Sequence, residues 1–171
     1  MRALWYLTPD AIVDNVVDVS LDLLARWGIR GVALDLDNTI VPWYTSALEP
    51  GIPQWVQRLR DAGIRMCLIT NNYGAQSKDV AVELGLPLVR GALKPLPIAF
   101  ARCLREMETE PAKALAIGDQ LFTDVLGAKL AGMKAVYVRP LAARAFLTTK
   151  FLRMIERPVF AQLRRAGVPG A

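Results

Sequence analysis

An apolar run at residues 31–34 ends in the polar residues Asp35, Asp37 and Thr39. A short apolar run bounded by turn-forming residues is typical of a strand buried on both faces of a parallel sheet. Because side chains alternate along a strand, Asp35 and Asp37 are expected to project to the same side of its carboxyl end. Two like charges held so close are unfavourable unless a cation or a proton lies between them. Taken alone, the segment allows a polar strand end with an Asx turn, or a divalent-metal site beside a nucleophilic carboxylate.

Strand-like runs alternate with helical patterns along the chain. Strands are predicted at residues 31–36, 64–70, 86–89, 112–117 and 134–138. Helices are predicted between them, over residues 53–62, up to Leu84, over residues 95–107 and up to Ala131. Such alternation predicts an α/β fold, in which one doubly wound parallel sheet is covered by helices on both faces, in three layers.

Additional helices are expected at both ends of this core. Thr8-Pro9-Asp10 has the pattern of a helix start and predicts a short helix over about residues 8–16. A second helix is predicted over residues 20–27. The chain, residues 1–171, is expected to form a single domain, with its core at about 29–140 and a helical tail at about 141–171.

The spacing between polar segments limits what can be inserted in this core. Thr39 and Thr70 are separated by enough residues for one helix and one strand, and so are Thr70 and Lys94. No cap domain is therefore expected. An uncapped site stays open, which suits a bulky substrate such as a lipid headgroup.

Composition excludes several kinds of chemistry. The chain has no histidine, which excludes Ser-His-Asp and Cys-His nucleophiles, phosphohistidine and His-ligated zinc. Cys67 and Cys103 lack the spacing of a metal site and are interpreted as reduced core thiols, in keeping with a cytoplasmic protein. The first ten residues lack the apolar region of a signal peptide, and no run is long enough to cross a membrane.

Polar residues follow the predicted strands in a fixed order. They are Asp35 and Asp37, then Thr70 and Asn71, then Lys94, then Asp119 and Asp124. Ligands of doubly wound sheets bind outside the carboxyl ends of the strands, so these side chains are expected at one edge. Each segment alone also fits an ordinary turn, a solvated lysine or a helix cap. Their joint occurrence favours a common site.

As a set, these residues predict phosphoryl transfer. Asp35 would attack phosphorus, while Thr70, the backbone N–H of Asn71 and the ammonium of Lys94 would hold the phosphate oxygens. Asp37 would protonate the leaving alkoxide and then deprotonate the water that hydrolyses the phosphorylated Asp35.

The same edge predicts a magnesium site. Mg²⁺ prefers carboxylate oxygens and retains several waters, so Asp35 and Asp119 suffice for direct ligation. Asp124 would contribute through a water molecule. Mg²⁺ would neutralise the attacking carboxylate and the phosphate oxygens.

Four segments of the chain resemble the motifs of haloacid dehalogenase (HAD) superfamily phosphatases. They are Asp35-Leu36-Asp37-Asn38-Thr39, Thr70-Asn71-Asn72, Lys94-Pro95 and Gly118-Asp119-Gln120-Leu121-Phe122-Thr123-Asp124. The closer resemblance is to the small subfamily III phosphatases, which include phosphatidylglycerophosphate phosphatases of bacteria and mitochondria. Other segments also look like that group, namely Leu7-Thr8-Pro9-Asp10, Gly91-Ala92-Leu93-Lys94-Pro95-Leu96-Pro97, and the late Thr149-Lys150, Arg153 and Glu156-Arg157.

The resemblance implies a role for each matching residue. Asp35 is the implied nucleophile, Asp37 the acid and base, and Thr70 and Lys94 the phosphate-holding residues. Asp119 is an implied magnesium ligand, together with the backbone carbonyl of Asp37. Asn38 stands where many superfamily members carry glycine, although it suits this subfamily.

The tail is basic, with seven of the 21 basic residues and only one acidic residue from Arg139 onward. Apolar and basic residues interleave between residues 140 and 165. This pattern allows two interpretations, a helix at the surface of an anionic membrane or a helix packed on the domain with its cations outward. The first would place the protein peripherally at the inner membrane face.

The function expected from the sequence is a Mg²⁺-dependent phosphatase that forms an aspartyl-phosphate, with phosphatidylglycerophosphate as the preferred substrate. A phosphatase of a soluble sugar phosphate or nucleotide is the alternative enzyme. The alternative of another class is a phospho-acceptor or interaction domain, which the second carboxylate two residues after Asp35 disfavours. No specific nucleic-acid partner is expected, and the oligomeric state is left open.

Overall fold

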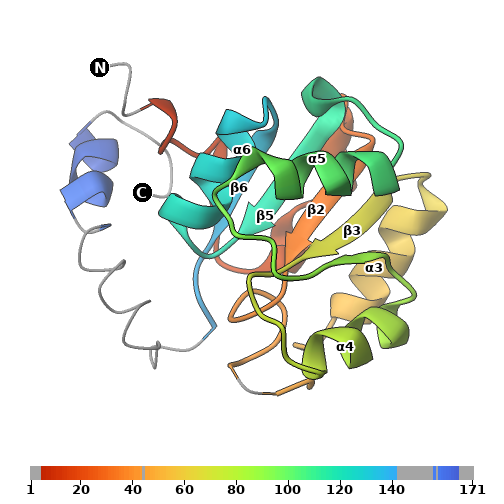
Figure 1. Ribbon diagram of the computed structural model, residues 1–171. Coiled ribbons are helices and arrows are strands. Elements are labelled where there is room, and N and C mark those ends of the chain that lie inside the picture. Colours follow the sequence, from red (N-terminus) through yellow and green to blue (C-terminus); the bar gives the residue numbers. More distant parts are fainter. Residues whose placement is uncertain (1–4, 44, 142–155, 157, 166–171) are drawn as a thin grey trace.

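A single parallel sheet of six strands forms the centre of the protein. The computed structural model describes residues 5–43, 45–141, 156 and 158–165 (Figure 1). The strands are β1 (Ala11–Val13), β2 (Gly31–Asp35), β3 (Arg65–Ile69), β4 (Leu88–Val89), β5 (Ala114–Gly118) and β6 (Lys134–Val138). They are ordered β1-β6-β5-β2-β3-β4, and all neighbours pair in parallel. The predicted doubly wound parallel α/β fold is confirmed.

Helices cover both faces of the sheet (Figure 1). On one face lie the 3₁₀ turn η1 (Val16–Asp18), α2 (Leu21–Arg26), α3 (Ile52–Asp61) and α4 (Gln76–Leu84). On the other lie α5 (Pro97–Glu106), the π-helical turn η3 (Leu121–Val125) and α6 (Leu126–Leu130). A further 3₁₀ turn, η2 (Pro111–Lys113), precedes β5. The described connections from β2 to β3 and from β3 to β4 contain α3 and α4, and the absence of a cap domain stays a prediction.

The two faces of the sheet carry side chains of different size. Val32, Leu34 and Leu68 point to the α3 face, whereas Ala33 and Cys67 point to the α5 face. Small side chains let α5 and α6 approach closely, and Gly127 of α6 leaves room for the ring of Phe100. A Cβ at Gly127 would lie 2.2 Å from that ring. The core is therefore layered by residue size.

The predicted helix over residues 8–16 is wrong. Ala11–Val13 forms the edge strand β1, which pairs with β6. Asp10, which looks like part of a helix start, instead accepts hydrogen bonds from the backbone N–H of Ala135 (2.8 Å) and from Lys129 Nζ (2.6 Å). Pairing with a distant strand overrides the local capping pattern. The helix predicted at residues 20–27 is present as α2.

The described part of the tail packs on the domain. Residues 158–165 lie in a helix, and Leu163 is fully buried in the α5 face of the core. The rings of Phe160 and Tyr137 meet edge to face, with centroids 5.0 Å apart. Arg164 and Arg165 are exposed. Packing is thus the interpretation that holds here, and tail residues 142–155, 157 and 166–171 lie outside the described residues. No described helix combines the length and hydropathy needed to span a bilayer.

Candidate active site

The predicted site residues converge at the carboxyl ends of the central strands. Asp35 ends β2, Thr70 directly follows β3, and Asp119 directly follows β5. The chain runs from β2 outward to β3 and β4, then returns to the other side of β2 as β5. Residues 90–96 cross this edge on their way to α5 (Figure 1) and bring Lys94 to Asp35. The site thus lies where the strand order reverses, the usual binding position in such sheets.

Three buried carboxylates share the centre of the site. Asp35, Asp119 and Asp124 each place one oxygen so that all three oxygens lie within 4.8 Å of one another. The Nζ of Lys94 lies 2.6 Å from Oδ1 of Asp35 and 2.6 Å from Oδ1 of Asp124. One ammonium contacts two of the three carboxylates, and the cluster carries an excess of negative charge when all three are ionised.

The pKa values of Lys94 and Asp124 reflect this excess. Burial disfavours the Lys94 ammonium, but the charges of Asp124 and Asp35 outweigh burial and raise the pKa of Lys94 above its usual value. Burial also raises the pKa of Asp124; the Lys94 ammonium opposes this rise and the charge of Asp35 adds to it. The two pKa values rise for different reasons. Two anionic neighbours stabilise the charged form of Lys94, whereas burial and a neighbouring anion destabilise the charged form of Asp124.

The cluster fits a hard divalent cation. Its donors are carboxylate oxygens, the ligands that Mg²⁺ prefers, and their mutual repulsion is reduced when a cation lies among them. Gly118 permits this arrangement, since a Cβ there would lie 2.3 Å from the carboxyl carbon of Asp124. The predicted metal ligands Asp35, Asp119 and Asp124 are therefore brought together.

Asp37 has partners outside this cluster. Its Oδ2 accepts a hydrogen bond from Thr70 Oγ1 (2.9 Å), and its Oδ1 lies 3.5 Å from Nδ2 of Asn72. Burial and the charge of Asp35 raise the pKa of Asp37, against the lowering effects of Thr70, Asn72 and Lys94. The two acids at the end of β2 thus occupy different environments. The Thr70 hydroxyl, which is predicted to hold phosphate, donates its hydrogen bond to Asp37 in this structure.

The side chain of Asn71 fastens two loops together. Its Oδ1 accepts from the backbone N–H of Lys94 (2.7 Å), and its Nδ2 donates to the carbonyl of Lys94 (3.3 Å). The loop after β3 is thereby joined to the loop after β4. The sequence predicts only a phosphate contact for the backbone N–H of Asn71, so the role of its side chain was missed.

Asn38 and Thr39 orient the acids, which the motifs did not predict. Thr39 Oγ1 donates to Oδ2 of Asp35 (2.9 Å), and Asn38 Nδ2 donates to Oδ2 of Asp119 (2.9 Å). Asn38 has φ = +64°, a left-handed conformation that asparagine and glycine tolerate better than other residues. This conformation explains why asparagine can replace the glycine that many superfamily members carry at this position. An asparagine at a glycine position was thus the sequence signal for a left-handed residue here.

The contact made by Glu156 was also missed, although the sequence resemblance includes Glu156-Arg157. The buried side chain of Glu156 accepts a hydrogen bond from the backbone N–H of Leu121 (2.6 Å). Leu121 lies between Asp119 and Asp124, so the tail supports the loop that carries both acids. No local pattern signals a contact between residues 35 positions apart.

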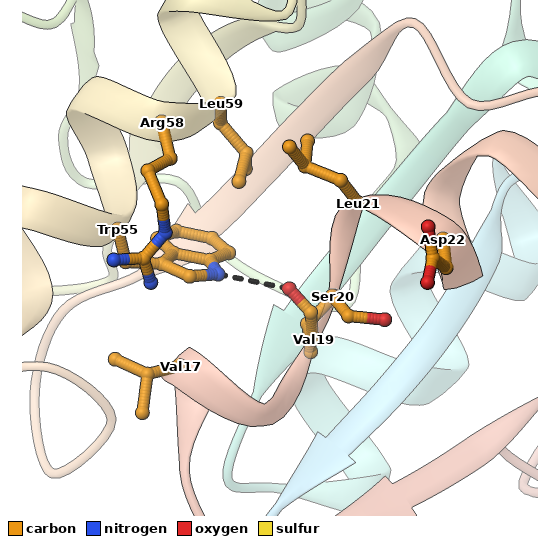
Figure 2. A pocket seen from close by; sticks show the side chains of 8 residues that line it. All are labelled: Val17, Val19, Ser20, Leu21, Asp22, Trp55, Arg58 and Leu59. Carbon is orange, nitrogen blue, oxygen red and sulfur yellow. Dashed lines mark hydrogen bonds between the residues drawn. The ribbon is translucent and has the colours of Figure 1, made fainter.

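A separate hollow of about 230 Å³ lies beside α3 and contains no candidate site residue. It is lined by Val17, Val19, Ser20, Leu21, Asp22, Trp55, Arg58 and Leu59 (Figure 2). The indole N–H of Trp55 is already bonded to the carbonyl of Val19 (2.9 Å; Figure 2). The indole N–H, which points into the hollow, is thus satisfied within the protein.

Comparison with known proteins agrees with this geometry. Residues 43–132 match the family model of haloacid dehalogenase-like hydrolases. The chain is 33% identical to a probable phosphatase of Bacillus subtilis over 162 residues, covering 95% of this chain and 94% of that protein.

Two curated relatives are named for a lipid substrate. A phosphatidylglycerophosphatase of Saccharomyces cerevisiae is 28% identical and covers 77% of each chain. Phosphatidylglycerophosphate phosphatase 1 of Arabidopsis thaliana is 23% identical, covering 94% of this chain and 48% of that protein. Among solved structures, a hypothetical protein of Xanthomonas campestris is 25% identical, with a TM-score of 0.54 over 72% of each chain.

Proposed function

The chain belongs to the haloacid dehalogenase-like hydrolases, as a phosphatase of the phosphatidylglycerophosphate phosphatase-like type, and we propose that it cleaves a phosphate monoester through a phosphorylated Asp35. We propose Mg²⁺ as its metal and phosphatidylglycerophosphate as its substrate.

The observation that carries the mechanism is the separation of the two acids at the end of β2. The Asp35 carboxylate accepts hydrogen bonds from Lys94 and Thr39, which hold it in place for attack. Asp37 is partly buried near that charge, and its raised pKa favours the protonated form. Neighbouring acids with different environments are the usual arrangement for a nucleophile and a general acid.

The reaction proceeds in two displacements. An oxygen of Asp35 forms a bond to phosphorus as the bond from phosphorus to the leaving oxygen breaks, and Asp37 gives its proton to that oxygen. Water then attacks the phosphorus of the acyl phosphate, Asp37 takes a proton from the water, and inorganic phosphate leaves. Asp35 returns as a carboxylate and Asp37 as an acid.

Different residues around Asp35 would hold the cation and the phosphate. Asp35, Asp119 and the backbone carbonyl of Asp37 would hold Mg²⁺, with Asp124 acting through water. The bound ion supplies charge neutralisation that lets a carboxylate approach an anionic phosphate. Lys94, Thr70 and the Asn71 backbone N–H would bind the phosphate oxygens.

Phosphate release with and without Mg²⁺ tests the mechanism. Asp35→Asn is expected to lower kcat by about a thousandfold or more, because no covalent intermediate can form. Wild-type enzyme quenched in acid during turnover of ³²P-labelled substrate should retain label, and Asp35→Asn should not. Label retained by Asp35→Asn would refute the assignment of the nucleophile.

The substrate is tested with a panel of monoesters. Phosphatidylglycerophosphate in detergent micelles is expected to have a kcat/KM well above those of sugar phosphates and nucleoside monophosphates. The two relatives named for this lipid support the choice, as does the expected lack of a cap. Preference for a soluble ester would overturn the lipid assignment and leave the phosphatase mechanism in place.

A further inference from the structure

Four large apolar side chains are exposed beside the candidate phosphate-binding loops. Tyr73, Leu93, Leu96 and Ile98, here called the apolar rim, are 70%, 62%, 51% and 66% exposed. Tyr73 follows Asn71 in the loop after β3, and the other three flank Lys94 between β4 and the first turn of α5. Single exposed apolar residues are normal at a protein surface, but a group of four is not.

The apolar rim stands on loops that are fastened to each other. The two hydrogen bonds between Asn71 and Lys94 join the loops. The Tyr73 ring lies against Gly91, where an added Cβ would lie 2.1 Å from the ring. The backbone N–H of Leu96 donates to the carbonyl of Leu93 (3.0 Å), which closes the turn around Lys94. The loops that carry the apolar rim are therefore fixed to each other beside Lys94.

Leu93 is unfavourable for folding in two respects. Its φ of +53° is in the left-handed region, which leucine adopts with strain and which glycine or asparagine would suit. Its side chain is mostly exposed, so it contributes little to the core. Neither its backbone conformation nor packing in the core accounts for an apolar residue at this position.

Charge near the apolar rim favours an anionic partner. Between Glu83 and Glu106 the sequence has four basic residues and no acidic one, although one of the four, Lys94, is buried and already paired with carboxylates of the site. Arg90 Nη1 donates to the carbonyl of Tyr73 (3.4 Å), which holds a guanidinium next to the apolar rim. Tyrosine, leucine and isoleucine beside arginine are the side chains suited to the headgroup region of a bilayer rich in anionic lipid.

We propose that the apolar rim inserts into the headgroup region of an anionic phospholipid bilayer, with Arg90 at the lipid phosphates. The carboxyl edge of the sheet then faces the membrane, so a lipid phosphate can reach Lys94 without leaving the bilayer. The inference rests on the proposed function and identifies the surface through which that function meets its substrate. It assigns membrane contact to the apolar rim and Arg90, whereas the described part of the tail is packed on the domain.

Sedimentation of the full chain with vesicles tests this surface without turnover. The vesicles are phosphatidylcholine with or without phosphatidylglycerol. The variant Leu93→Asn/Ile98→Gln removes apolar surface and places a tolerated residue at the left-handed position, so it is expected to fold. The control Val82→Gln changes a side chain that is 81% exposed on α4, away from both loops.

Wild type and Val82→Gln are expected to sediment with the anionic vesicles. Leu93→Asn/Ile98→Gln should bind them about tenfold or more weakly, because apolar insertion and charge act together. Equal binding by the double variant, or no binding by wild type, would overturn the proposal. Analytical ultracentrifugation gives another outcome that would overturn it, namely a dimeric wild type and a monomeric double variant. The apolar rim would then contact a second copy of the chain. Failure of the proposed function appears separately, as absent hydrolysis of the lipid in micelles.

Discussion

Asp37 makes the clearest pH prediction at the scale of single residues. Burial and the charge of Asp35 raise the pKa of Asp37 in the folded protein above the ordinary value for an aspartate. The folded state therefore holds the proton more tightly, and stability is lost as pH rises from the unfolded pKa through the folded one.

Asp37→Asn removes this ionisation. In EDTA, the free energy of unfolding of the variant minus that of wild type should increase as pH rises from about 4 to about 7. Urea unfolding at a series of pH values measures the difference. Asp22→Asn, at an exposed position of α2, is the control and should show no such trend. A flat difference for Asp37→Asn would contradict the assigned environment.

Lys94 makes a prediction about the metal site. Lys94→Met leaves two buried carboxylates without their ammonium and should lower the free energy of unfolding in EDTA by roughly 3–5 kcal/mol at neutral pH. Mg²⁺ should restore more stability to this variant than it adds to wild type, because the cation relieves the same repulsion.

Lys129→Met is the matched control for Lys94→Met. Lys129 is also buried and lies 2.6 Å from a carboxylate, Asp10, away from the metal site. Its loss should destabilise the protein without rescue by Mg²⁺. Equal rescue of both variants would show that the ion acts elsewhere.

At the scale of elements, Glu156 is expected to act through the loop that it supports. Glu156→Ala removes the acceptor for the Leu121 N–H and should weaken Mg²⁺ binding about tenfold, in the range of other residues that position metal ligands. Isothermal titration calorimetry with Mg²⁺ measures the effect. Glu156→Gln keeps an acceptor oxygen and should recover most of the affinity, whereas unchanged binding by Glu156→Ala would rule out the positioning role.

Elements were predictable from the sequence where their signals are local. The five strands after residue 30 follow from apolar runs, and the acids and amides at their ends follow from the rule that ligands meet at carboxyl ends. Strand β1 was missed because Thr8-Pro9-Asp10 imitates a helix start, while its pairing partner lies more than a hundred residues away. The contact of Glu156 with Leu121 was missed for the same reason. The left-handed conformation of Leu93 was not predictable, because leucine rarely adopts a positive φ.

At the scale of the whole molecule, Leu163 tests whether the tail belongs to the fold. Its side chain is fully buried against the α5 face, so Leu163→Ala should lower the free energy of unfolding by about 2–4 kcal/mol. Leu130→Ala changes a leucine that is 46% exposed on α6 and should have a much smaller effect. Similar small losses in both variants would mean that the helix at residues 158–165 detaches in solution.

The outer strands of the sheet have a consequence for colloidal behaviour. The four inner strands have five residues each, whereas the edge strands β1 and β4 have three and two. Short edges present few unpaired backbone groups to another chain, and this limits edge-to-edge association. Loss of β1 from β6 would expose the edge of a five-residue strand, so this pairing limits association of a chain with 53% hydrophobic residues.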